Sequence, residues 1–245
     1  MAYNATKILI GINVMVFLLV FSLGIGSEAF NGVFDSYSFS GGKMLEAWRW
    51  VTSLFLHASA SHLFFNMLGL YFFGKVLESR MPRQWFLSIY FVAGLLGNLV
   101  FALTSTAPVV GASGAIFGLM GAAMLLHPTE LINIYIIPLP LSIVAVLFVI
   151  VEAFVLYFQP SSFGNVATVA HVGGLVTGAV FAMFRSWKQS MKGIFIVGVS
   201  FALLIFLGPI FGFITGIGSL VLNFVDFAVG LVLYGFANAL SFIWA

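Results

Sequence analysis

Four polar side chains lie in stretches of sequence that are otherwise apolar: His62, Asn66, Ser113 and His171. A serine hydroxyl becomes an effective nucleophile when an imidazole removes its proton, and the same imidazole can then protonate a leaving amine. No acidic residue lies near His171 in the sequence, which favours a Ser113–His171 dyad over a triad. Attack on an amide creates an oxyanion, and the candidate donors for it are the Asn66 amide, the His62 ring and the Ser113 backbone N–H.

The composition places these residues in a membrane protein. Of 245 residues, 62% are hydrophobic and 7% are charged, whereas soluble domains contain about 25% charged residues. A soluble domain, a disordered chain, a collagen-like chain and a disulfide scaffold are therefore excluded, and cysteine is absent. Long unbroken apolar runs also differ from the alternating segments of about ten residues in a β-barrel. The predicted fold class is an all-α polytopic membrane protein.

Eight apolar stretches are candidate membrane spans, each of which needs about 20 residues. They cover residues 8–26, 59–77, 85–105, 112–126, 132–158, 168–185, 193–214 and 219–242. The first is longer than the apolar core of a signal peptide, so we expect a retained span. The last two stretches contain few polar residues, which predicts an appended C-terminal transmembrane hairpin, without an assigned role, over residues 193–245.

The basic residues predict the orientation, because cytoplasmic loops carry an excess of Lys and Arg. With the N-terminus inside, the cytoplasmic group is Lys7, Lys75, Arg80, Arg83, Arg185, Lys188 and Lys192. Only Lys43 and Arg49 then lie outside. The predicted location is a prokaryotic plasma membrane, with an organelle membrane as the alternative. The N-terminus is then cytoplasmic and the candidate site opens to the outer side.

This topology brings three polar residues to a similar depth. The second, fourth and sixth stretches all start from the outer side, and His62, Ser113 and His171 lie within about three residues of those starts. At a rise of about 1.5 Å per residue, the three side chains lie at one shallow level. Polar groups inside a membrane are costly, so each is a candidate site residue.

Glycines predict how two of these stretches approach each other. Small residues at four-residue spacing let helix backbones pack closely in lipid. In the fourth stretch the small residues are Gly114 and Gly118, which follow Gly111. In the sixth they are Gly174, Gly178 and Ala182. If these faces meet, Ser113 and His171 come together at the outer end.

The ordered set of these residues resembles the rhomboid family of intramembrane serine proteases. The matching pieces are Trp48-Arg49, His57, His62, Asn66, Leu77-Glu78, Gly111-Ala112-Ser113-Gly114, Ala170-His171, Gly174 and Gly178. Each piece alone is short, whereas the set in this order on alternate helices is specific. The resemblance covers residues 8–185 and implies a rhomboid-like six-helix catalytic core over residues 1–192.

The resemblance implies a role for each site residue. Ser113 would be the nucleophile and His171 the general base. His62, Asn66 and the Ser113 backbone would form the oxyanion hole. Phe117 occupies a position where an aromatic ring packs under the catalytic histidine.

The resemblance also implies the partners. Substrates would be single-span transmembrane proteins cut in or near the lipid bilayer, and the fifth span with its following loop would gate their lateral access. No metal and no other cofactor is expected, and the scattered basic residues do not predict binding to nucleic acid. The oligomeric state is left open.

Other interpretations of the same residues remain. A catalytically silent rhomboid-like protein would bind membrane clients without cutting them, although such proteins typically lack the serine or the histidine. A small transporter would typically show repeat symmetry, and none is visible. His57 is interpreted as structural, and Glu78 as an interfacial salt-bridge partner of Arg80 or Arg83. A metal site formed by His57, His62 and His171 is disfavoured, because no carboxylate of suitable spacing joins them.

Overall fold

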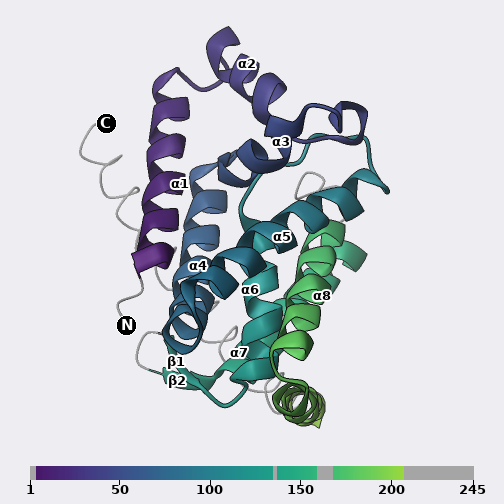
Figure 1. The fold of residues 1–245 in the computed structure, drawn as a ribbon. Helices are drawn as coiled ribbons and strands as arrows, with labels where there is room; N and C mark the ends of the chain where they lie inside the picture. The colour runs from purple at the N-terminus through teal and green to yellow at the C-terminus, as the bar shows by residue number, and fades with distance from the viewer. Residues whose placement is uncertain (1–3, 135–136, 159–167, 207–245) are drawn as a thin grey trace, which may run out of the picture. The chain divides into compact units, whose positions relative to one another are not determined.

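The computed structural model describes residues 4–134, 137–158 and 168–206. The chain divides into two compact units, residues 1–200 and 201–245, and every candidate site residue lies in the first. Its helices are α1 (Asn4–Ser22), α2 (Glu28–Tyr37), α3 (Ala47–Thr52), α4 (Ala60–Arg80), α5 (Arg83–Ala102), α6 (Ser113–Leu126), α7 (Leu141–Phe158) and α8 (Thr168–Arg185) (Figure 1). The 3₁₀ turns η1 (Gly41–Lys43) and η2 (Ser53–Phe55) flank α3, and the strands β1 (Leu131–Ile134) and β2 (Ile137–Pro140) precede α7. A further helix spans Trp187–Phe206.

The predicted all-α class is confirmed, and the long apolar helices fit a protein that crosses the membrane several times. Within the described residues, α1, α5, α8 and Trp187–Phe206 are long and apolar enough to span a bilayer. Helix α4 has 21 residues, but His62, Asn66 and Lys75 lower its mean hydropathy. The six-helix core followed by two C-terminal spans stays a prediction, because the stretch 219–242 lies outside the described residues.

Helix α6 lies at the centre of the first unit, packed against α4, α5 and α8 (Figure 1). Twelve of its 14 residues are buried, so its surroundings are protein on all sides. Ala, Leu and Met favour the helical backbone within it. It ends at Leu126, just before His127-Pro128, because a residue that precedes proline is disfavoured in the helical conformation.

The glycine faces of α6 and α8 meet, and their backbones touch. A Cβ atom at Gly174 would collide with the backbone of Gly114, and one at Gly178 would collide with the backbone of Gly118. Only glycine therefore allows this helix separation at Gly174 and Gly178. The contact holds the first turns of α6 and α8 at a fixed distance.

The stretch 132–158 is not one helix, which corrects the prediction. Strands β1 and β2 form an antiparallel hairpin in which Leu131 pairs with Pro140 and Ile134 with Ile137. Pro138 and Pro140 have no backbone N–H, so they do not continue a helix ladder. Helix α7 therefore begins at Leu141 rather than at residue 132.

Residues 187–200 pack against the end of α6 and the start of α7. A Cβ atom at Gly193 would meet the backbone of Leu125 in α6. The Ser200 hydroxyl lies 2.9 Å from that of Ser142 in α7 and donates to it. In Figure 1 this helix is seen end-on, while α8 runs along the page. The boundary predicted between residues 192 and 193 lies within this helix, and the two-domain division remains a prediction.

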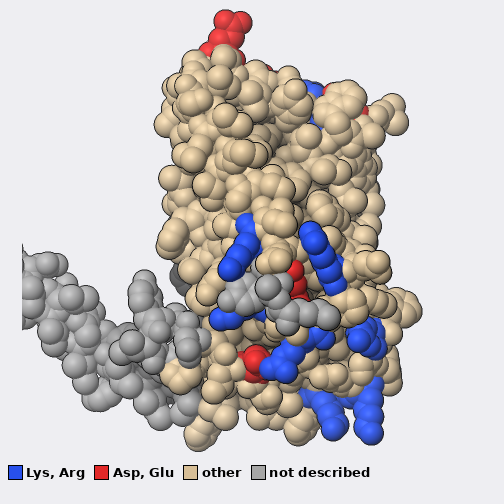
Figure 2. All heavy atoms as spheres, turned by 60° about the vertical axis from the view of Figure 1, so that its left-hand side comes forward, with Lys and Arg blue, Asp and Glu red and all other residues tan. Residues whose placement is uncertain are grey.

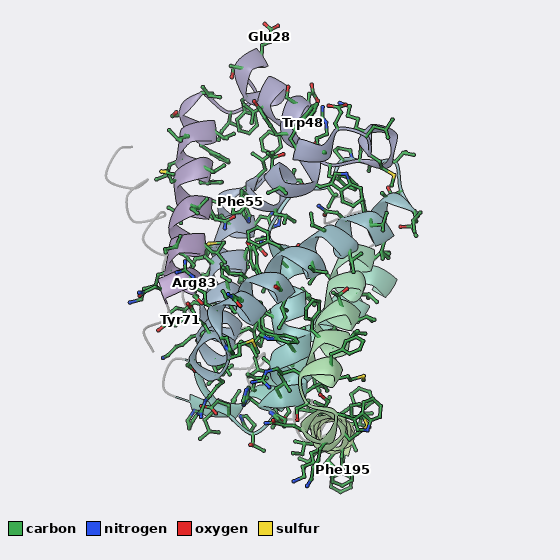
Figure 3. All side chains as sticks on the ribbon, viewed as in Figure 1. Glu28, Trp48, Phe55, Tyr71, Arg83 and Phe195 are labelled. Carbon is green, nitrogen blue, oxygen red and sulfur yellow. The ribbon has the colours of Figure 1, made fainter. Side chains whose placement is uncertain are left out.

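Charged side chains gather toward the two ends of the first unit. Figure 2 shows Lys and Arg concentrated toward one end, next to a band of the surface where no charged side chain is seen on this face. In Figure 3, Glu28 and Trp48 lie toward one end and Phe195 lies at the opposite end, with Arg83 between them. This separation agrees with the two groups of basic residues expected on opposite sides of the membrane. Which side faces the cytoplasm stays a prediction.

Candidate active site

The imidazole of His171 is stacked on the ring of Phe117. The ring centroids are 4.4 Å apart and the ring planes are 4° from parallel. Phe117 lies one turn after Ser113 on α6, and residues four apart share a helix face. The stack therefore holds the imidazole on the face of α6 that carries Ser113. His171 is buried, whereas Ser113 is half-buried and stays accessible.

Helix α4 begins where it can present His62 and Asn66 toward the start of α6. Ser59 is the N-cap residue, and its hydroxyl accepts a hydrogen bond from the His62 backbone N–H at 3.1 Å. Because His62 and Asn66 are four residues apart, they share one face of α4. His62 is half-buried and Asn66 is buried.

Gly111 lies against both of these side chains. Its φ angle is +119°, which strongly favours glycine. A Cβ atom there would lie 2.7 Å from His62 Nε2 and 3.4 Å from Asn66 Nδ2. The backbone that leads into Ser113 thus passes beside two side-chain donors. A carbonyl oxygen bound at Ser113 could meet donors from α4 and from the first turn of α6.

The amide nitrogen of Asn66 is an unsatisfied donor. Among the described residues, none offers an acceptor within hydrogen-bonding distance of the buried Asn66 Nδ2. A buried donor without a partner costs free energy and calls for a functional explanation. An oxyanion that exists only during catalysis is one such acceptor.

The ring of His57 packs against the ring of His62. The two rings are in edge contact, with centroids 5.0 Å apart. His57 is 2% exposed, and within the described part of the chain neither of its ring nitrogens has a hydrogen-bond partner. Burial, together with the nearby His62, lowers the pKa of His57 to about 3. His57 is therefore neutral at physiological pH and acts as a packing group.

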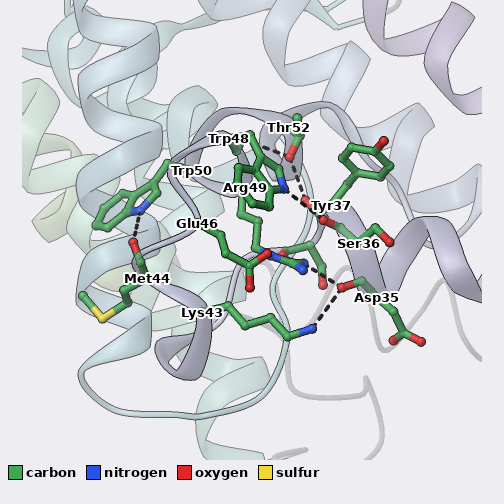
Figure 4. A network of polar contacts seen from close by, with 11 residues as sticks. Asp35, Ser36, Tyr37, Lys43, Met44, Glu46, Trp48, Arg49, Trp50 and Thr52 are labelled. Atoms are coloured by element: carbon green, nitrogen blue, oxygen red, sulfur yellow. Dashed lines mark hydrogen bonds and ion pairs between the residues drawn. The ribbon is translucent and has the colours of Figure 1, made fainter.

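The connection between α1 and α4 is an ordered structure built around Arg49 (Figure 4). The buried Arg49 Nη1 donates to the carbonyl oxygens of Asp35 at 2.6 Å and Ser38 at 3.0 Å. Its Nε pairs with Glu46 at 2.7 Å. These bonds tie α2 to α3 and fix the segment that leads into η2.

Within the described residues, Glu78 pairs with neither Arg80 nor Arg83, which corrects the prediction. Its carboxylate accepts hydrogen bonds from the backbone N–H groups of Ala5 and Thr6 at the start of α1. The nearby cation Arg80 pairs instead with Glu130, at 2.9 Å. The free N–H groups at the start of a helix are fixed in position and carry partial positive charge. They therefore bind a carboxylate in a more defined geometry than a mobile arginine side chain does.

Two polar residues near the site were missed from sequence. Asn98 in α5 donates through Nδ2 to the Ser53 hydroxyl at 3.0 Å, and both residues are buried. Asn98 is a polar residue within an apolar span, a signal that could have identified it.

The described residues contain no group of three or more His, Cys, Asp or Glu that could hold a metal ion. The absence of a metal site stays a prediction.

Comparison with known proteins supplies independent evidence. A family profile described as the rhomboid domain matches residues 44–188, which is more than half of the chain. The chain belongs to the rhomboid family. This rhomboid is 34% identical over 151 residues to YdcA of Bacillus subtilis, and the match covers 60% of this chain and 71% of YdcA.

Two further relatives match over shorter shares of their own length. RHOMBOID-like protein 12, mitochondrial, of Arabidopsis thaliana is 30% identical over 166 residues, which are 59% of this rhomboid and 47% of the relative. Rhomboid protease GlpG of Yersinia pseudotuberculosis is 28% identical over 149 residues, which are 61% of this rhomboid and 52% of GlpG. The chain thus spans about half the length of each. Family membership and long apolar helices make this rhomboid an integral multi-pass membrane protein.

Proposed function

We propose that this rhomboid is an intramembrane serine endopeptidase that uses a Ser113–His171 dyad. The observation that carries the proposal is the stack of His171 on Phe117, which holds the imidazole on the Ser113 face of α6. The family supports the protease class, since GlpG is named a rhomboid protease. The unsatisfied donor of Asn66 supports the assignment of an oxyanion hole.

The proposed reaction has two steps. His171 takes the proton from Ser113 Oγ as that oxygen attacks the scissile carbonyl carbon, and then gives the proton to the departing amine. The carbonyl oxygen gains negative charge, which the Asn66 amide, the His62 ring and the Ser113 backbone N–H stabilise. A water molecule then attacks the acyl-enzyme and His171 accepts a proton from it. The bond between the acyl carbon and Ser113 Oγ breaks, and Oγ takes that proton from His171 to restore the hydroxyl.

The proposed substrates are membrane proteins with a single transmembrane segment. A half-buried Ser113 between α4, α6 and α8 can be reached by a chain that comes from the bilayer and unwinds locally. Helix α7 is the proposed lateral gate. The proposed setting is a prokaryotic plasma membrane with the site toward the outer side.

The experiment compares purified protein, reconstituted in liposomes, on a single-span test substrate. Wild type should cleave, whereas Ser113→Ala and His171→Ala should lose at least about a thousandfold in turnover. Matched controls are Ser79→Ala and His127→Ala, which remove the same residue types at the inner end and should cleave normally. Cleavage that persists in Ser113→Ala would exclude Ser113 as the nucleophile.

Labelling with a fluorophosphonate separates the protease from a silent client binder. An activated serine reacts with this probe even when the test substrate is a poor one. Modification of Ser113 in wild type, but not in His171→Ala, is the expected result. If wild type neither cleaves nor reacts while it binds the substrate, the protein binds clients without cutting them.

A further inference from the structure

The turn before Ser113 is held by a single backbone hydrogen bond to η2. The Gly111 N–H donates to the carbonyl oxygen of Ser53 at 2.8 Å. Gly111 is also the residue that lies against His62 and Asn66. The position of Ser53 therefore bears on where Ser113 and its backbone N–H lie relative to the two side-chain donors.

Ser53 is in turn held by α5. Its hydroxyl accepts a hydrogen bond from Asn98 Nδ2 at 3.0 Å, in a buried environment. The neighbouring Leu54 packs into a notch on the same helix, where a Cβ atom at Gly94 would lie 2.9 Å from Leu54 Cδ2. The contact between Leu54 and Gly94 holds η2 against α5, and the hydrogen bond from Asn98 fixes the orientation of Ser53.

The same turn of α5 also touches the segment that carries His171. A Cβ atom at Gly97 would lie 2.7 Å from the carbonyl oxygen of Ala170, the residue before His171. Two adjacent residues of α5 thus lie next to the segments that carry the proposed dyad. Gly97 approaches Ala170, which precedes His171, and Asn98 is linked to the turn before Ser113 through Ser53 and Gly111.

We propose that Asn98 and Ser53 are positioning residues, which set the Gly111–Ser113 turn against the oxyanion donors through the Asn98–Ser53 hydrogen bond. This inference rests on the proposed protease function. Preorganised donors act only if the oxyanion forms within hydrogen-bonding distance of them. A small shift of the Gly111–Ser113 turn therefore slows the chemical step while leaving substrate binding in place.

The decisive variant is the double substitution Ser53→Ala/Asn98→Leu. It removes both partners of the bond and leaves neither one buried without a partner, so stability should be close to that of wild type. We expect kcat on the single-span test substrate in liposomes to fall about tenfold, with KM within about twofold. The rate of Ser113 labelling by a fluorophosphonate should fall by a similar factor. The single variants Ser53→Ala and Asn98→Leu serve the same comparison if the double variant does not fold.

Two controls separate positioning from general stability. Ser53→Thr keeps the hydroxyl and should retain kcat within about twofold. Ser200→Ala removes a hydrogen bond of the same kind, buried at the inner end, and should leave kcat unchanged. The two single variants should each lose as much kcat as the double variant, because they break one and the same bond.

Three results would overturn the inference. The first is a double variant that cleaves at the wild-type rate. The second is a double variant with a raised KM and an unchanged kcat. The third is a Ser200→Ala protein that loses as much kcat as the double variant does. In each of these cases wild type still cleaves and still reacts at Ser113, so the proposed function stands. If wild type neither cleaves nor reacts at Ser113, the proposed function itself is wrong and the inference falls with it.

Discussion

Glu78 binds Thr6 twice, through the backbone and through the side chain. One carboxylate oxygen accepts the Thr6 N–H at 2.9 Å and the Thr6 hydroxyl at 2.8 Å, and the other accepts the Ala5 N–H at 2.7 Å. All three bonds are buried, and they join the start of α1 to the end of α4. Three of the donors at the start of α1 are thereby satisfied by one side chain.

Glu78→Gln should lower the free energy of unfolding by about 2 kcal/mol, because an amide offers one acceptor oxygen where the carboxylate offers two. Thermal unfolding in mild detergent measures the change. Ser79→Ala is the matched control at the next position, where the side chain is exposed and bonds only within its own helix. Equal melting temperatures for Glu78→Gln and Ser79→Ala would contradict the prediction.

Phe117→Ala should lower kcat on a single-span substrate about tenfold or more, because the imidazole of His171 loses the ring that orients it. Phe117→Tyr keeps the ring and should retain most of the activity. Phe181→Ala is the control, since Phe181 is in edge contact with Trp85 rather than with a site residue. A Phe117→Ala protein that turns over substrate as fast as Phe181→Ala would exclude an orienting role for the stack.

Gly178→Ala should destabilise the protein by about 3 kcal/mol, because the new methyl group meets the backbone of Gly118 and cannot be relieved by a side-chain rotation. Gly198→Ala is the control within a helix. A Cβ atom there meets nothing within 4 Å, so this substitution should be neutral or slightly stabilising. If both variants melt at the wild-type temperature, the close approach of α6 and α8 is wrong.

Acid should destabilise this rhomboid through His57. The pKa of His57 is lowered from 6.5 to about 3 in the folded protein, mainly by burial. Between these two values the unfolded chain binds a proton that the folded chain does not, so stability falls as the pH falls below 6.5. From pH 7 to pH 5 this linkage costs about 2 kcal/mol.

His57→Phe tests this linkage, because it keeps a ring of similar shape and removes the titration. The comparison is the loss of unfolding free energy between pH 7 and pH 5 in the two proteins. Wild type should lose about 2 kcal/mol more than His57→Phe. Parallel losses in both proteins would show that His57 does not account for the acid sensitivity.

The helical elements were predictable where hydropathy alone determines them. The stretch 168–185 is α8, residue for residue, and 112–126 differs from α6 by one residue. The predicted start of the stretch 132–158 was wrong. Pro138 and Pro140 leave the run as apolar as a membrane span, but they lack the backbone N–H groups that helical hydrogen bonds need. The ordered turns around Arg49 were also missed, since the carbonyl groups that bind its guanidinium carry no signal in side-chain type.

The candidate site was predictable in part for a similar reason. His62, Asn66 and Ser113 could be identified because polar groups within apolar spans are costly. The bond between Asn98 and Ser53 joins residues 45 positions apart and depends on how η2 docks on α5. The partner of Glu78 lies 72 residues away on α1, whereas sequence proximity pointed to Arg80. Pairings across the fold follow from packing, which spacing in the sequence does not encode.

Helix α6 is too short to cross a bilayer. Its 14 residues extend about 21 Å, against about 30 Å of hydrocarbon. Non-helical backbone, in the turn before Ser113 and in the β1–β2 hairpin, must make up the difference. Such backbone is tolerated at membrane depth only where protein or water satisfies its polar groups. For the proposed protease, this mismatch thins the apolar layer at the Ser113 end of α6, which gives a route for the second reactant, the water molecule that would release the product.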